Sequence, residues 1–212
     1  MYSTLAECRV LPVVTAHNID TTVLLTKALV KGGMRAVEIT LRTEAALDCI
    51  RAVKEEVPGA LVAAGTVTTP AELERAIEAG ADFFVSPGST SNLLAAAAEA
   101  QVSFLPGIAT ASELMQAMDH GFSHFKLFPA VAAGGITLLK SLAGPFPEAQ
   151  FCPTGGLNRK NFRDFLALPN VLCCGGSWMV ADDLVAGAQW QQIEELAREA
   201  MSNSNHSSQG ES

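Results

Sequence analysis

The chain has 212 residues, the length of one domain, and its 49% hydrophobic content predicts a large core with strands buried on both faces. A net charge of −8, with scattered Lys and Arg residues, argues against a nucleic acid or an anionic membrane as partner. No apolar run is long enough to span a bilayer, and the first residues lack a signal-peptide pattern. We therefore expect a cytoplasmic protein.

Short apolar stretches alternate with helical patterns along the chain. Two of the helical patterns, beginning at Thr69 and Thr110, open with the Thr-x-x-Glu spacing of a capping box and close at a glycine. The apolar stretches are often β-branched and mostly end at Gly, Pro or Thr, which is typical of strands. These candidate strands begin at Arg9, Ala36, Ala60, Asp82, Ser103, His124, Gln150 and Val171.

This alternation predicts an α/β fold with parallel strands and right-handed crossovers. Eight strand–helix units fit a single-domain (β/α)8 TIM barrel over residues 1–200. An open doubly wound sheet is the alternative, but its dinucleotide-binding form expects G-x-G-x-x-G after the first strand, where this chain has "PVVTAHNID". The Ser/Asn-rich residues 201–212 predict a disordered tail.

Five cysteines and four histidines show no spacing typical of a disulfide framework or a metal site. We expect free thiols in a reducing compartment. We also expect neither a metal site nor a cofactor.

A lysine interrupts the sixth candidate strand, "HFKLFPA". Strand alternation places Phe125 and Leu127 against the helices and turns Lys126 and Phe128 inward. The same alternation in the second strand, "AVEITLR", turns Glu38, Thr40 and Arg42 inward. Buried charges are costly unless they are paired or functional. Lys126 and Glu38 form either a structural ion pair or part of a site, and Arg42 either braces a loop or binds a ligand.

Glycine pairs follow the last two candidate strands. "PTGGL" runs into an expected helix beginning at Asn158, and "GGSW" ends the eighth strand. Glycines let backbone amides approach an anion closely, and a helix N-terminus adds partial positive charge. These two loops are the usual phosphate site of such a barrel. The alternative is that the glycines only form tight turns.

Together these residues suggest one chemistry. Burial disfavours the cationic form of a lysine, and a neutral amine attacks a carbonyl to form an imine, which stabilises a neighbouring carbanion. Glu38 is placed to move protons, and Arg42 to clamp a carboxylate. The pattern favours a metal-free class I aldolase acting on a phosphorylated 2-keto acid. The alternatives are a phosphate-binding barrel isomerase or decarboxylase using Lys126 as acid/base, and a non-catalytic sugar-phosphate sensor.

An ordered set of motifs carries a resemblance to a known family. From about Leu5 to Ala200 the chain resembles 2-keto-3-deoxy-6-phosphogluconate (KDPG) aldolases, a family that includes 4-hydroxy-2-oxoglutarate aldolase. The motifs are "VEITLRT", "AAGTV", "FVSPG", "PGIATASELM", "FKLFPA", "AGPFP", "FCPTGGL" and "GGSW".

The resemblance implies a homotrimer that cleaves the phosphorylated keto acid to pyruvate and glyceraldehyde 3-phosphate, the last step of the Entner–Doudoroff route, with 4-hydroxy-2-oxoglutarate as a further substrate. It implies Lys126 as the Schiff-base residue and Glu38 as the general acid/base. It assigns the pyruvate carboxylate to Arg42 and Thr66, the pocket lining to Pro87 and Phe128, and the phosphate end to Thr154, Gly155, Gly156, Gly176 and Ser177.

Two positions depart from the family pattern. Val131 stands where many members carry an acidic residue, and the first strand ends without the basic residue that some relatives place there. These departures leave the preference between phosphorylated and unphosphorylated substrates open.

Overall fold

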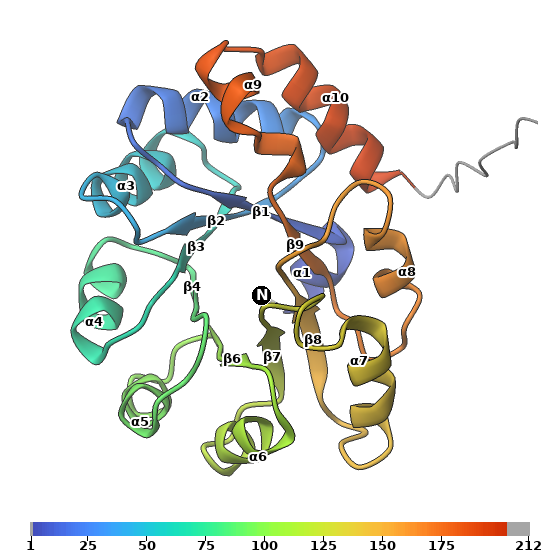
Figure 1. Cartoon of the computed structure of the whole chain (residues 1–212). Coiled ribbons are helices and arrows are strands. Elements are labelled where there is room, and N and C mark those ends of the chain that lie inside the picture. Colours follow the sequence, from blue (N-terminus) through green and yellow to red (C-terminus); the bar gives the residue numbers. More distant parts are fainter. Residues whose placement is uncertain (1, 203–212) are drawn as a thin grey trace, which may run out of the picture.

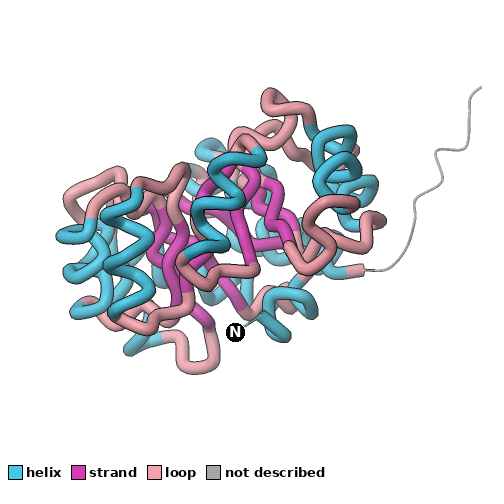
Figure 2. The backbone as a smooth tube through the Cα atoms, turned by 90° about the horizontal axis from the view of Figure 1, so that it is seen from below, coloured by secondary structure: helices cyan, strands magenta, loops and turns pink. Residues whose placement is uncertain are grey.

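In the computed structural model, which describes residues 2–202, parallel strands curl around a common centre and helices cover their outer side (Figure 1). One sheet has the order β5-β4-β3-β2-β1-β9, and the other has the order β6-β7-β8. The view from below, turned by 90°, shows the strands enclosed by helices and loops (Figure 2). The predicted parallel α/β architecture is confirmed.

Each observed strand lies within one of the predicted stretches. The fifth stretch is divided at Pro106, whose ring nitrogen has no hydrogen to donate to a neighbouring strand. The strands are β1 (Val10–Val14), β2 (Ala36–Thr40), β3 (Leu61–Gly65), β4 (Phe83–Val85), β5 (Phe104–Leu105), β6 (Gly107–Ile108), β7 (His124–Leu127), β8 (Gln150–Pro153) and β9 (Cys174–Gly176).

The helices follow the strands as the sequence predicts, and both capping boxes are present, with Thr69 paired to Glu72 and Thr110 paired to Glu113. The sequence did not predict the N-terminal helix or the short helices near the C-terminus. The helices are α1 (Tyr2–Cys8), α2 (Ile19–Lys31), α3 (Ala46–Glu56), α4 (Pro70–Glu78), α5 (Ser91–Glu99), α6 (Ala111–Asp119), α7 (Gly135–Ala143), α8 (Phe162–Leu166), η1 (Trp178–Val180), α9 (Asp182–Ala186) and α10 (Trp190–Met201).

Neighbouring strands from β1 to β5 follow the order of the chain. A doubly wound sheet instead reverses its strand order and carries helices on both faces. Here the backbone N–H of Lys126 in β7 donates to Pro106 O, next to β5, at 2.9 Å. Isolated bridges join Phe151 to Val171 and Thr154 to Gly175 at the opposite edge. The doubly wound alternative is therefore wrong.

Two separate apolar clusters occupy the two faces of the curled sheet. The larger lies between strands and helices, and the smaller fills part of the interior. Leu5 and Cys8 of α1 belong to the interior cluster together with Phe83, which is fully buried. Helix α1 lies near the centre of the ring in Figure 1 and closes one end of the interior. Helix α1 thus contributes its apolar side chains to the interior cluster.

The five cysteines are free, as predicted, and all of them are buried. Within residues 2–202 no group of His, Cys, Asp and Glu side chains has an arrangement that could hold a metal ion. No helix of that same part of the chain is long and apolar enough to cross a bilayer. The predicted tail lies outside the described residues except for Met201, which ends α10, and Ser202.

The contact between α1 and β7 predicts a pH-dependent loss of stability. The Tyr2 ring stacks on the His124 ring at 3.6 Å between centroids, and burial lowers the pKa of the His124 imidazole. The unfolded state binds a proton more readily than the folded state. The contribution of neutral His124 to the free energy of unfolding is therefore fully present above the ordinary histidine pKa of about 6.5, and it decreases as the pH falls below that value. Urea unfolding measures this loss.

His124→Phe is the matched variant, because it keeps an aromatic ring against Tyr2 but cannot titrate. The variant should lose less free energy of unfolding than the original protein between pH 7.5 and pH 5, values that bracket the ordinary pKa of about 6.5. Equal losses in the two proteins would remove His124 as the cause.

Candidate functional site

Lys126 lies in the middle of β7 and only 5% of it is exposed. Its neighbours in register are Gly107 on β6 and Cys152 on β8. Phe125 and Leu127 pack in the outer cluster, so the lysine side chain points to the interior, as the alternation predicted.

Glu38 of β2 meets this lysine across the interior. Lys126 Nζ donates to Glu38 Oε1 at 3.0 Å and to Oε2 at 3.4 Å, and the glutamate is 1% exposed. An ammonium has three donors, and a buried pair is favourable only when its remaining protons are also satisfied. Both contacts of Lys126 go to one carboxylate, and no other acceptor within residues 2–202 bonds its nitrogen. The protein therefore holds the amine and the carboxylate in direct contact across the interior.

The positive charge of Lys126 also acts on Cys152. The pKa of the Cys152 thiol is lowered, chiefly by a hydrogen bond with Cys173, against the opposing effect of burial. The charge of Lys126 adds to the lowering. The amine therefore lies among apolar groups and buried thiols on one side and a single carboxylate on the other.

Arg42 lies just beyond the end of β2 and is exposed. Its Nε donates to Thr40 Oγ1 at 3.1 Å, and Thr40 in turn donates to Val14 O at 3.0 Å. No carboxylate of the described chain forms an ion pair with the guanidinium. Its terminal nitrogens are therefore available to an anion.

Thr66 follows β3 with a φ of 58°, in the left-handed region. This conformation is rare for a β-branched residue and costs about 1–3 kcal/mol. Such strain persists where the surrounding structure over-determines it, often at binding sites. Thr66 lies at the same edge of the sheet as Arg42, because both follow the carboxyl ends of neighbouring parallel strands.

Three further predicted residues lie near the lysine or at the same edge. The Phe128 ring centroid is 5.5 Å from Lys126 Nζ. Thr154, at the end of β8, is 7% exposed, and its hydroxyl occupies the space that a side chain on Gly175 would need. Pro87 follows β4, and its backbone lies so close to Gly107 that a Cβ atom there would collide with it.

Glycine is needed in the two last loops for different structural reasons. Gly155 and Gly156 have φ values of 98° and 81°, which favour glycine. Gly176 gives room to the Trp178 ring, and Ser177 is exposed beside it. The expected helix start at Asn158 was wrong, since α8 begins at Phe162 and has 5 residues. The glycine pair therefore does not lie at a helix N-terminus, and only its backbone amides favour an anion.

Sequence reasoning assigned no role to two positioning residues. Thr40 was expected to point inward, but its bond to Arg42 was not foreseen. Ser86 is fully buried and its hydroxyl accepts the Gly107 N–H at 3.0 Å, which ties the loop after β4 to β6. The only sign of this role in the sequence is a serine directly before "PG" at the end of an apolar stretch. That pattern does not identify Gly107 as the hydrogen-bond partner.

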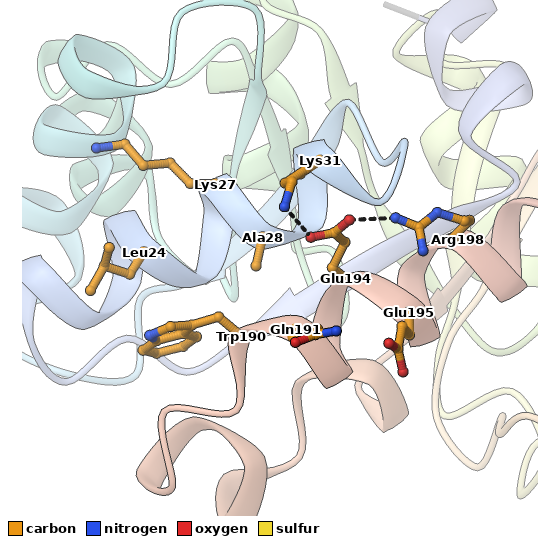
Figure 3. A pocket seen from close by; sticks show the side chains of 9 residues that line it. All are labelled: Leu24, Lys27, Ala28, Lys31, Trp190, Gln191, Glu194, Glu195 and Arg198. Atoms are coloured by element: carbon orange, nitrogen blue, oxygen red, sulfur yellow. Dashed lines mark hydrogen bonds and ion pairs between the residues drawn. The ribbon is translucent and has the colours of Figure 1, made fainter.

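A groove of about 540 Å³ lies outside the strand ring, between α2 and α10 (Figure 3). Glu194 projects between Lys31 and Arg198 and forms ion pairs with both. These charges are matched locally, and the groove contains none of the residues around Lys126. It does not provide the amine chemistry.

The comparisons with known proteins agree with this geometry. A family model described as KDPG and KHG aldolase matches residues 1–196. The chain belongs to the KDPG and KHG aldolase family. The family predicted from the motifs is thus confirmed.

The KHG/KDPG aldolase of Escherichia coli strain K12 is 51% identical over 192 residues, which cover 91% of this chain and 90% of that protein. A 2-dehydro-3-deoxy-phosphogluconate aldolase of Pseudoalteromonas atlantica is 49% identical, covering 91% and 89%.

A solved KDPG aldolase of Legionella pneumophila, with pyruvate captured as a covalent carbinolamine intermediate, has a TM-score of 0.92 and 41% identity, covering 95% of this chain and 98% of that chain. The Zymomonas mobilis aldolase with 3-phosphoglycerate has a TM-score of 0.88 and 41% identity, with 96% of each chain covered. A structure of KGPDC from Streptococcus mutans is 11% identical, so its TM-score of 0.69 shows the fold alone.

The buried pair of Lys126 and Glu38 predicts that removing one charge destabilises the protein more than removing both. Lys126→Met leaves the Glu38 carboxylate buried without its cation, which should cost about 3–5 kcal/mol of unfolding free energy. Lys126→Met combined with Glu38→Leu should recover most of that loss, because two apolar side chains need no partner. Urea unfolding of the single and double variants measures this, and a double variant as unstable as the single would contradict it.

Proposed function

We propose that this chain is a class I aldolase that cleaves 2-keto-3-deoxy-6-phosphogluconate to pyruvate and glyceraldehyde 3-phosphate through an imine on Lys126. The observation that carries this is a buried amine 3.0 Å from a buried carboxylate at the centre of a KDPG and KHG aldolase fold. A carboxylate at this distance accepts a proton from the ammonium and leaves a nucleophilic amine.

The reaction begins when the Lys126 amine attacks the keto carbon and forms a carbinolamine. Glu38, now protonated, gives its proton to the departing hydroxyl, and loss of water yields the protonated imine. The carboxylate form of Glu38 then takes the proton of the substrate hydroxyl, while the carbon–carbon electron pair moves into the iminium and the aldehyde leaves. Protonation of the resulting enamine at carbon and hydrolysis of the imine release pyruvate. The carbinolamine captured in the Legionella relative is the intermediate that these steps require.

We assign the carboxylate end of the substrate to Arg42 and Thr66. The exposed guanidinium without an ion pair and the strained threonine support this assignment. A planar guanidinium binds a carboxylate through two parallel hydrogen bonds. Pro87 and Phe128 then line the space around the keto carbon.

We assign the phosphate end to Thr154, Gly155, Gly156, Gly176 and Ser177. Glycines at positive φ in one loop and an exposed serine in the other support this assignment, because backbone amides and a hydroxyl suit phosphate oxygens. The Zymomonas relative was solved with 3-phosphoglycerate, which supports a phosphorylated substrate for this chain. Val131 is 48% exposed and lies close to Gly156, so it adds an apolar edge to this end.

We further propose 4-hydroxy-2-oxoglutarate as a second substrate, because the curated Escherichia coli relative carries both activities in its name. An isomerase or decarboxylase that uses Lys126 only as acid/base is less favoured, since relatives near 50% identity are aldolases. A non-catalytic sensor would not need a carboxylate against the lysine.

We also propose the finer features that the family resemblance implies. The two sheets form one closed (β/α)8 TIM barrel, which the bridges at Phe151 and Thr154 support. The protein acts as a cytoplasmic homotrimer in the Entner–Doudoroff route. Light scattering of the purified protein tests the trimer.

The imine makes a direct prediction. Borohydride added in the presence of pyruvate should reduce the imine and leave a stable carboxyethyl group on Lys126, located by peptide mass mapping. Lys126→Ala should lose the adduct and turnover while circular dichroism still reports a folded chain. Lys140→Ala is the matched control, because this exposed helix residue should change neither result. An isomerase would give no adduct on Lys126.

Glu38→Gln tests the proton transfers separately. The variant should still bind pyruvate, because an amide keeps the shape of the site, but it cannot accept a proton. Exchange of the pyruvate methyl protons with deuterium oxide, followed by NMR, should slow by about 10²–10⁴-fold. Exchange at the normal rate would remove Glu38 from this role.

A further inference from the structure

Glu38 occupies space that only a glycine at position 65 leaves open. Glu38 is in register with Ala63 of β3, and Gly65 lies two residues further along β3, at its carboxyl end. The two residues share the interior face because side chains alternate along a strand. The Glu38 side chain therefore leans over Gly65 toward the open end of the interior.

The distances make this contact specific. A Cβ atom on residue 65 would lie 2.5 Å from Glu38 Cγ and 2.7 Å from Cδ, and closer still to Oε1. Real Cβ atoms essentially never approach other heavy atoms within 3.0 Å. The three nearest heavy atoms all belong to Glu38, so a methyl group here would collide with the carboxylate arm before any other group.

The backbone gives no separate reason for a glycine at this position. Gly65 is not among the residues of positive φ, whereas Thr66, the next residue, is. Alanine is therefore compatible with the local conformation, and its cost comes from the side-chain collision. Glu38 cannot escape by shifting its backbone, because β2 is paired on both sides, to Val13 of β1 and to Ala63 of β3.

We propose that Gly65 is a positioning residue whose missing side chain holds the Glu38 carboxylate against Lys126. This inference rests on the proposed acid–base role of Glu38. A methyl group at position 65 forces the carboxylate away from the site 3.0 Å from Lys126 Nζ. Proton transfer requires hydrogen-bond reach, and misplacement by about 1 Å costs about 10²-fold in rate.

The test is a cycle of Gly65→Ala, Glu38→Ala and the double variant, with Gly144→Ala as the matched control. Gly144 has a φ of −68° and no heavy atom within 4 Å of a Cβ built on it. Gly65→Ala should lower kcat by about 10²-fold with little change in KM, because Arg42 and Thr66 still bind the substrate. In the Glu38→Ala background the same change should cost nothing further, and Gly144→Ala should match the original protein.

Melting temperature provides a readout that does not depend on activity. Gly65→Ala should lower the melting temperature of the original protein but not that of Glu38→Ala, where the methyl group has room. If Gly65→Ala alone fails to fold while the double variant folds, the collision with Glu38 is supported. Three results would each overturn the proposal. They are a normal kcat in Gly65→Ala, a decrease in kcat by the same factor in both backgrounds, and a double variant that also fails to fold.

The same set distinguishes this inference from the proposed function. If Glu38→Ala turns over normally, the acid–base role fails and the positioning role with it, whatever the melting temperatures show. If borohydride still traps pyruvate on Lys126 but the two backgrounds respond equally to Gly65→Ala, only the positioning role fails.

Discussion

The contact between Lys126 and Glu38 is the interaction on which the rest of the site depends. Two opposite charges at 5% and 1% exposure are costly to desolvate, and each is tolerated only because the other lies 3.0 Å away. The pair forms across the interior, between β7 and β2. These two strands face each other only because the sheet curls, so the pair depends on the curled sheet. The fold brings the two strands together, and the pair places an amine beside a carboxylate.

The division of the interior into two parts follows from the same constraint. One end is closed by α1 and filled with apolar groups such as Leu5 and Phe83. This packing fills that end with side chains, and the carboxyl ends of the strands supply Arg42, Thr66 and the glycine loops at the other end. A substrate that is anionic at both ends and has a keto group between them matches this distribution of charge.

Small residues determine the geometry as much as charged ones. Gly107 lets the loop after β4 approach, Gly175 makes room for Thr154, and Gly65 makes room for Glu38. None of these three has a positive φ, so their importance lies in space rather than in backbone freedom. Close packing explains this, because one added methyl group in a filled interior must displace something.

Alternation along "AVEITLR" and "HFKLFPA" was enough to predict that Glu38 and Lys126 point inward, because side-chain direction in a strand is a local property. Capping boxes at Thr69 and Thr110 were equally readable, since their spacing is local. The packing of helix α1 into the interior cluster and the fit of Glu38 over Gly65 were decided only in three dimensions. Both bring together residues from different elements, and no pattern within one element encodes the distance between them.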